Sequence, residues 1–148
     1  MVTYQVEAYS DCIEEMKEHY DDHYNELSVT KTVVLEPDYD SYFTLEKTGF
    51  LKVVTCRKEG KLIGYIMFIV NGHLHYKSCI TAHEDIYYIT KSERKGRVGI
   101  KLFQFAEQYL KSIGVNRIIY GTKTHLDNSR LFEYLGYSFF EKLYTKMI

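Results

Sequence analysis

A basic, glycine-containing loop that leads into a helical pattern is the part of this sequence best suited to chemistry. It begins the stretch 92–110, and Gly96 and Gly99 lie where the helical pattern starts. A helix N-terminus presents unpaired N–H groups and the positive end of the helix dipole, so it attracts anions. Glycine lets an anion come close to the backbone. The nearby cations are Lys91, Arg94, Lys95 and Arg97, opposed only by Glu93.

These features predict a site for a pyrophosphate group, and the alternative interpretation is a solvated basic turn. The two major nucleotide-binding fingerprints do not fit the loop. It lacks the lysine-serine/threonine ending of one, and the glycine spacing of the dinucleotide-binding folds is missing. The loop alone therefore does not decide between a binding site and a turn.

The elements on either side of the loop would position it. The residues before it, 85–89, form a strand pattern that begins at or after Ile80. The residues after it, 100–112, have helical spacing, and Gly114 ends the helix. Its apolar side consists of Leu102, Phe103, Ala106, Tyr109, Leu110 and Ile113.

The rest of the chain also alternates between strand and helix patterns. Ser10 or Asp11 is expected to cap the first helix, which runs on to Leu27, and Asn71-Gly72 is expected to form a turn. Strands interleaved with helices predict an α/β or α+β sheet covered by helices on both faces. Further strands are expected at 2–8, 51–57, 62–70, 117–120 and 139–147, and further helices at 37–47 and 128–135.

Composition places limits on the protein class. The 148 residues, 45% of them hydrophobic with one proline, predict one globular domain over 1–148. A net charge of −1 provides no global attraction to nucleic acid or membrane. Three cysteines fit no closed disulfide framework and predict reduced thiols. With no leader pattern and no apolar run long enough to span a membrane, we expect a cytoplasmic protein.

The loop resembles the coenzyme A loop of the GCN5-related N-acetyltransferases (GNAT superfamily). That family's pattern is Gln/Arg-x-x-Gly-x-Gly/Ala after a central strand, and here residues 89–99 read ITKSERKGRVG. Arg94 matches the first position of the pattern and Gly99 the last. Arg97 stands at the first glycine, with Gly96 beside it, so a shifted glycine would have to supply the backbone room.

Two further segments carry the same resemblance. Residues 131–137, LFEYLGY, are similar to the family's Leu-Tyr-Glu-Lys-Leu-Gly-Phe helix end. Residues 60–68, GKLIGYIMF, are similar to its second and third strands. The three segments follow the family's order along the greater part of the chain, which is more specific than the loop alone.

The resemblance implies a fold and a reaction. The fold is a mixed, mostly antiparallel, twisted sheet of about six to seven strands with helices on both faces and splayed central strands. Acetyl-CoA, the cosubstrate, lies between the splayed strands and gives its acetyl group to a primary amine by direct attack in a ternary complex. Ile89 would offer backbone groups to the pantetheine arm, and Asn128 would touch it. The pyrophosphate would be bound by Arg94, Lys95, Gly96, Arg97, Val98 and Gly99.

The same resemblance implies catalytic groups. An amine attacks only when deprotonated, and many family members place a carboxylate base before the core of the central strand. Glu84 is our preferred base, with Asp85 and His83 as alternatives. Strand pleating allows only one of Glu84 and Asp85 to face the cleft. The alternative is a solvated carboxylate pair at the start of a strand.

The general acid is less well matched. The family's tyrosine, which protonates the departing thiolate, aligns with Phe132, which has no proton to give. Tyr134 lies about 200° further round the helix and cannot replace it. Tyr137 is the first candidate and Tyr144 the second, unless the reaction proceeds without an acid. A catalytically inactive acyl-CoA-binding module is therefore the alternative function.

The remaining patterns concern partners. The stretch 11–26 holds seven carboxylates against Lys17, which predicts a cationic small-molecule or peptide acceptor; the alternative is a solvated helix face. His73 and His75 lack a third ligand, so no metal is expected. A nucleic-acid patch at 91–101 ranks third because the net charge is balanced. The sequence is also compatible with a homodimer. Tyr39, Tyr42, Tyr87 and Tyr88 are interpreted as core-edge residues, one or two of which line the acceptor pocket.

Overall fold

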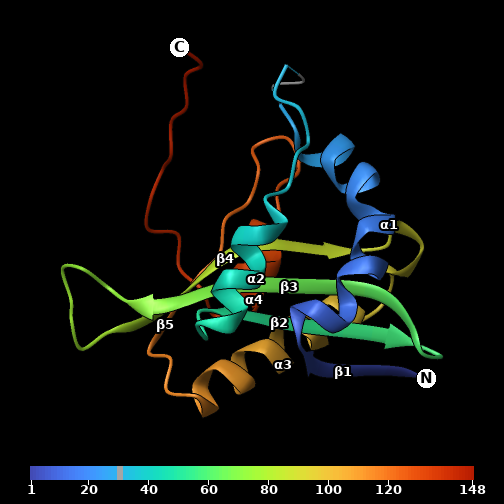
Figure 1. The fold of residues 1–148 in the computed structure, drawn as a ribbon, viewed down its shortest axis with the longest axis horizontal. Helices are drawn as coiled ribbons and strands as arrows, with labels where there is room; N and C mark the ends of the chain where they lie inside the picture. The colour runs from blue at the N-terminus through green and yellow to red at the C-terminus, as the bar shows by residue number, and fades with distance from the viewer. Residues whose placement is uncertain (30–31) are drawn as a thin grey trace.

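The fold is a five-stranded sheet with two helices on each face, seen in a computed structural model that describes residues 1–29 and 32–148 (Figure 1). The expected strands and helices before residue 136 are present, most with ends shifted by one or two residues. In chain order they are β1 Val2–Glu7, α1 Tyr9–Leu27, α2 Tyr39–Lys47, β2 Leu51–Lys58, β3 Lys61–Gly72, β4 Ile80–Ile89, η1 Lys91–Glu93, α3 Val98–Ser112, β5 Arg117–Ile119 and α4 Ser129–Tyr134.

The sheet has the strand order β1-β2-β3-β4-β5. The first three pairings are antiparallel, and β5 lies parallel to β4. The prediction of a mixed, mostly antiparallel sheet with helices on both faces is therefore confirmed. The expected six to seven strands are too many, since the described residues form five.

The missing strand is the one expected at 139–147. After α4 the chain runs away from the body of the protein in extended form (Figure 1), and Leu143 and Tyr144 are 86% and 92% exposed. Apolar residues in this segment recur every fourth position, at 139, 143 and 147 and at 140, 144 and 148. That spacing does not give the alternation of a strand with one buried face.

Two smaller expectations are also wrong. Asn71-Gly72 is not a turn, because β3 continues through both residues and Gly72 pairs with Ile80 of β4. Helix α1 begins at Tyr9 with Ala8 as its N-cap, so neither Ser10 nor Asp11 caps it. The long β3 strand provides pairing partners for every residue of β4 except Asp85, and β4 leads into the basic loop.

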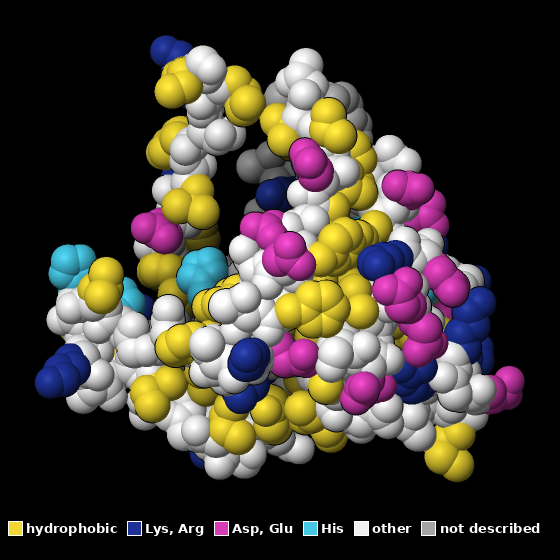
Figure 2. Space-filling model, in the orientation of Figure 1, with side chains coloured by type: hydrophobic (Ala, Val, Ile, Leu, Met, Phe, Trp, Pro, Cys, Tyr) yellow, Lys and Arg dark blue, Asp and Glu magenta, His cyan; other side chains and the backbone are white. Residues whose placement is uncertain are grey.

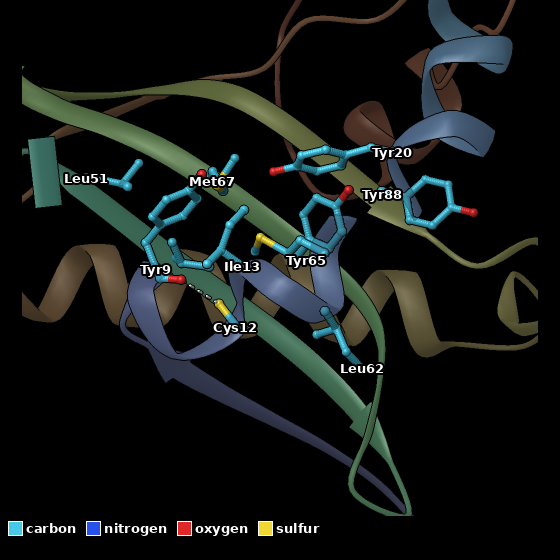
Figure 3. Close-up of a cluster of buried hydrophobic side chains, with 11 residues drawn as sticks. Tyr9, Cys12, Ile13, Tyr20, Leu51, Leu62, Tyr65, Met67 and Tyr88 are labelled. Atoms are coloured by element: carbon cyan, nitrogen blue, oxygen red, sulfur yellow. Dashed lines mark hydrogen bonds between the residues drawn. The ribbon is translucent and has the colours of Figure 1, made fainter. Parts of the chain in front are cut away.

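Two apolar layers hold the helices on the sheet. On one face, α1 packs its buried side, including Ile13 and Tyr20, against Tyr65 and Met67 of β3 (Figure 3). On the other face, α3 and α4 contribute Leu102 and Phe132 to a second cluster. Burial on both faces explains why β3 reads as a nearly continuous apolar run.

We expect the free energy of unfolding to fall as the pH drops from about 6.5 towards 4, because His23 is buried in its neutral form. The side chain lies against Tyr65 and Tyr88, and burial lowers its pKa to about 4. The unfolded chain takes up the proton near pH 6.5, so acid favours unfolding. Denaturant unfolding at several pH values measures this slope. In His23→Phe the slope over this range should shrink, and an unchanged slope would contradict the assignment.

Candidate functional site

Strands β4 and β5 separate at Glu84, and the gap between them is bridged by side chains of β4. Their last backbone pair is His83 with Ile119. Beyond it, Glu84 Oε2 accepts the N–H of Gly121 at 2.8 Å, and the Tyr87 hydroxyl donates to the Gly121 carbonyl at 2.9 Å. Both polar groups of Gly121 are thus bound by side chains of β4. The splayed central strands are present as expected.

A β-bulge decides how Glu84 and Asp85 are oriented. Met67 of β3 pairs with Ile86 and Phe68 with Glu84, which leaves Asp85 as the extra residue. Glu84 points to the β5 side through Gly121, whereas Asp85 accepts the hydroxyl of Tyr42 of α2 at 2.6 Å. The two carboxylates therefore border different surfaces, and Glu84 is the one at the gap.

The surroundings of Glu84 shift its pKa in the direction that suits a general base. Burial raises the pKa of its carboxyl, and the N–H of Gly121 offsets only part of that rise. A carboxyl with a raised pKa holds a proton more strongly than an exposed one, which suits a group that must accept a proton from an amine. The His83 side chain is exposed, and its Nδ1 lies 3.0 Å from the Glu84 carbonyl oxygen.

The loop after β4 ends in a helix N-terminus with free N–H groups. Gly96 has φ +69°, a value that favours glycine. Helix α3 begins at Val98, and Lys101 donates to the Arg97 carbonyl at 2.9 Å. The N–H groups of residues 98–100 precede that bond and lie in the first helical turn, where no carbonyl of the helix can accept them.

Two glycines enclose Ile89 and fix this helix against the end of β4. A Cβ on Gly64 would lie 2.9 Å from Ile89 Cγ1, and a Cβ on Gly99 would lie 3.3 Å from its Cδ1. The first contact would overlap and the second would be tight. Ile89, predicted to contact the coenzyme, thus packs between β3 and α3.

The cations of the loop are divided into two pairs. Lys91 and Arg94 both bind the carboxylate of Glu26, with Nζ and Nη2 at 3.4 and 2.8 Å. Lys95 and Arg97 are exposed and make no ion pair with any residue that the structure describes. The loop's own acid, Glu93, binds Lys58. Two of the four predicted cations therefore have no ion-pair partner within residues 1–29 and 32–148.

Other predicted residues lie in different surroundings. Asn128 comes to the gap, where its Nδ2 donates to the Tyr87 hydroxyl at 3.1 Å. Tyr137 donates its hydroxyl to Glu107 of α3 at 3.1 Å, and Tyr144 extends into solvent. His73 and His75 lie together with ring centres 5.6 Å apart, and no metal-binding group of three is found among the residues described.

Tyr87 is the polar residue at the gap whose role the sequence did not reveal. Its ring lies edge-on to the buried ring of Phe132, with centres 5.9 Å apart, and its hydroxyl contacts Gly121 and Asn128. Burial raises the pKa of the Tyr87 hydroxyl, so it keeps its proton at neutral pH. The signal available in the sequence was a tyrosine two residues before Ile89 on a strand that leads into the loop.

The comparison with protein families decides the identity of this arrangement. The model of the acetyltransferase (GNAT) family matches residues 11–137. The chain belongs to this family. It is therefore an acyltransferase. The GNAT fold accounts for the separation of β4 from β5 and for the helix N-terminus of α3 that follows β4. Among curated protein sequences, none is significantly similar to this chain.

Solved structures agree on the fold at low sequence identity. A ribosomal-protein-alanine N-acetyltransferase from Brucella melitensis biovar Abortus 2308 is 13% identical with a TM-score of 0.72, covering 100% of this chain and 99% of its own. Glucosamine-6-phosphate N-acetyltransferase from Arabidopsis thaliana is 17% identical with a TM-score of 0.70, covering 98% of each chain. A predicted acetyltransferase with acetyl-CoA from Clostridium acetobutylicum is 10% identical with a TM-score of 0.72, covering 99% of this GNAT chain and 96% of its own.

No helix among the described residues of this GNAT protein has the length and apolar character needed to cross a membrane.

Proposed function

We propose that this GNAT protein transfers the acetyl group of acetyl-CoA to a primary amine by direct attack in a ternary complex. The observation that carries the proposal is the placement of a half-buried carboxylate, Glu84, and a helix N-terminus at the two ends of one strand segment. From Glu84 to Ile89 a strand covers about 17 Å. That separation suits an extended pantetheine arm, with the diphosphate at the loop and the thioester beside Glu84.

The loop fits a diphosphate in three respects. The free N–H groups of residues 98–100 offer hydrogen bonds, and Lys95 and Arg97 offer charge that no described acidic residue neutralises in an ion pair. Gly96 and Gly99 carry no side chain over this backbone, and open space surrounds the Cβ position of Gly96. The chain's residues therefore match the anion that coenzyme A carries.

Bound acetyl-CoA supplies an acyl group activated as a thioester, and the protein must remove a proton from the acceptor. Glu84 is our candidate base, because it lies at the branch of β4 and β5 and burial raises its pKa. The attacking nitrogen loses its proton to Glu84, directly or through one water. The departing sulfur needs a proton or a stabilising donor.

Tyr87 is our candidate for that donor. The family tyrosine is replaced by Phe132, and the Tyr87 ring packs edge-on against this phenylalanine. The Tyr87 ring therefore lies beside the position where the helix lacks a hydroxyl, and its own hydroxyl lies at the gap, against Gly121 and Asn128. Both hydroxyls have internal acceptors, the Gly121 carbonyl for Tyr87 and Glu107 for Tyr137, so Tyr87 is preferred for its place at the gap and must leave that carbonyl to serve the sulfur.

A cationic acceptor fits the charge of α1. Asp11, Glu14, Glu18 and Asp21 are exposed on this helix, and Figure 2 shows acidic side chains gathered on the side where α1 lies. Opposite charge on the acceptor would raise its local concentration at low salt. A panel of peptide and small-molecule amines distinguishes the two kinds of acceptor.

We expect acetyl-CoA to bind the wild-type protein and Gly99→Val to abolish that binding while leaving the fold intact. Valine would place two methyl groups over the first turn of α3, where the free N–H groups lie, while the 3.3 Å contact of its Cβ with Ile89 Cδ1 requires only a small shift of that side chain. Isothermal titration calorimetry measures the affinity. Gly99→Ala is the graded control and should bind more weakly than wild type. Full affinity in Gly99→Val would place the coenzyme elsewhere.

Release of the coenzyme thiol in the presence of polyamines, aminoglycosides, amino acids and lysine peptides tests the transfer itself. Turnover with one amine class supports the proposal. Binding of acetyl-CoA without turnover on any of them would favour the second candidate, an acyl-CoA-binding module, which the phenylalanine at position 132 supports.

A further inference from the structure

Glu26 is a carboxylate in an unfavourable position that two loop cations compensate. It lies one residue before the end of α1, where the helix dipole disfavours negative charge, and its side chain is 12% exposed. No basic residue occupies the last turn of α1. Burial raises the pKa of Glu26, but hydrogen bonds from Arg94 and Lys91 outweigh it, so the pKa is lowered overall. The charged carboxylate thus depends on these two residues of the coenzyme loop.

Arg94 is folded back against α1 rather than extended into solvent. Its Nη2 donates to both oxygens of Glu26 at 3.0 and 2.8 Å, and its Nε donates to the Ile89 carbonyl at 2.8 Å. The guanidinium also lies 5.5 Å from the centre of the Tyr88 ring. Arg94 is therefore hydrogen-bonded both to the carboxylate of Glu26 and to the main-chain carbonyl of Ile89 at the end of β4.

These are the groups that the coenzyme is expected to use. Arg94 and Lys91 belong to the basic loop proposed to meet the diphosphate, and Ile89 offers its backbone to the pantetheine arm. We propose that Glu26 competes with the coenzyme diphosphate for Arg94. Glu26 holds the Arg94 side chain against α1 until the diphosphate takes the place of the Glu26 carboxylate. The inference rests on the proposed function, since it assumes that this loop binds coenzyme A.

A third segment meets the same residue. His125, in the connection between β5 and α4, donates from Nε2 to the Glu26 carbonyl at 2.7 Å. The end of α1, the coenzyme loop and the β5–α4 connection are therefore joined at Glu26. Displacement of Arg94 by the coenzyme would therefore alter the surroundings of both Glu26 and His125.

Glu26→Gln tests the competition through the direction of its effect. Glutamine keeps the shape and can accept one hydrogen bond from Arg94, but it carries no charge to hold the arginine. We expect the dissociation constant of coenzyme A, measured by calorimetry at low salt, to fall by about three- to tenfold. Damage to the fold would weaken binding instead. Glu26→Asp, which keeps the charge but shortens the reach, should give a smaller gain.

Glu133→Gln is the matched control, because it makes the same change in net charge on an exposed residue of α4. Its affinity should stay near that of wild type. Weaker binding by Glu26→Gln, or a gain no larger than that of Glu133→Gln, would overturn the proposal. If wild type binds no coenzyme A at all, the proposed function fails, and the competition fails with it.

A double-mutant cycle isolates the contact itself. Arg94→Gln removes the coenzyme contact of Arg94 but also the internal ion pair, so its cost in wild type should be small. In the Glu26→Gln background Arg94 is already free, and the same substitution should weaken binding several-fold more. Equal costs in the two backgrounds would show that Glu26 does not restrain Arg94.

Discussion

Glu84→Gln should lower kcat/KM for the best amine of the substrate panel by about 10²- to 10³-fold, without changing the affinity for acetyl-CoA. The carboxylate lies where β4 and β5 separate and accepts the N–H of Gly121 at 2.8 Å. Glutamine can keep that hydrogen bond through its carbonyl oxygen, but it cannot take a proton from the amine. The loss should therefore fall on the chemical step.

The pH profile distinguishes a base from a structural carboxylate. Burial raises the pKa of Glu84, so wild-type activity should fall as the pH drops through that raised value. Glu84→Gln should lose this acid limb. Since burial disfavours the charged carboxylate, an uncharged side chain is expected to leave the protein at least as stable at neutral pH. A drop in activity could then not be assigned to unfolding.

Asp85→Asn is the matched control for Glu84. It removes the neighbouring carboxylate, the extra residue of the bulge, which accepts the hydroxyl of Tyr42 of α2 rather than facing the gap. Its kcat should stay within a few-fold of wild type, and any effect should appear in KM for the acceptor. If Asp85→Asn loses the activity and Glu84→Gln keeps it, Asp85 is the base and our assignment is wrong.

Gly64→Ala should lower the free energy of unfolding by about 3 kcal/mol. A Cβ at this position would lie 2.8 Å from the Tyr88 carbonyl oxygen, as well as 2.9 Å from Cys56 Sγ and from Ile89 Cγ1. A main-chain carbonyl in the centre of the sheet cannot move without disturbing the pairing of β3 with β4. The end of β4, which leads into the coenzyme loop, should shift with it.

Gly72→Ala tests whether that cost comes from the contacts of Gly64 or from any glycine in β3. Both residues lie in the same strand, but the nearest neighbour of a Cβ at Gly72 is the Lys77 carbonyl at 3.9 Å. Denaturant unfolding should therefore separate the two variants clearly. Equal stabilities would mean that the sheet adapts at Gly64 at little cost.

Local patterns predicted the elements that surround the site. The 3.6-residue spacing of Leu102, Phe103 and Ala106 predicted α3, and these side chains are buried in the structure. The glycines before that helix predicted an open N-terminus, which the structure has. Such features depend on residues close in the sequence, where helix geometry and glycine chemistry act directly.

Contacts between distant residues were not predictable. The bulge at Asp85 depends on the register between β3 and β4, and no spacing within β4 reveals it. Glu26 and Arg94 are 68 positions apart, and in the sequence each belongs to a different run of charged residues. The strand expected at 139–147 is absent for a related reason. Its residues have local β-propensity, but a strand also needs a partner strand to pair with, and local propensity does not provide one.

The most direct measurement of the central claim is a titration of the wild-type protein with acetyl-CoA followed by backbone amide resonances. Our account predicts that the largest shifts fall on residues 95–100 and along 84–89, with smaller ones near Asn128. Glu26 and His125 should also respond, because displacement of Arg94 alters their junction. No saturable shift at millimolar acetyl-CoA, or shifts confined to other surfaces, would contradict the assignment of this gap as the acetyl-CoA site.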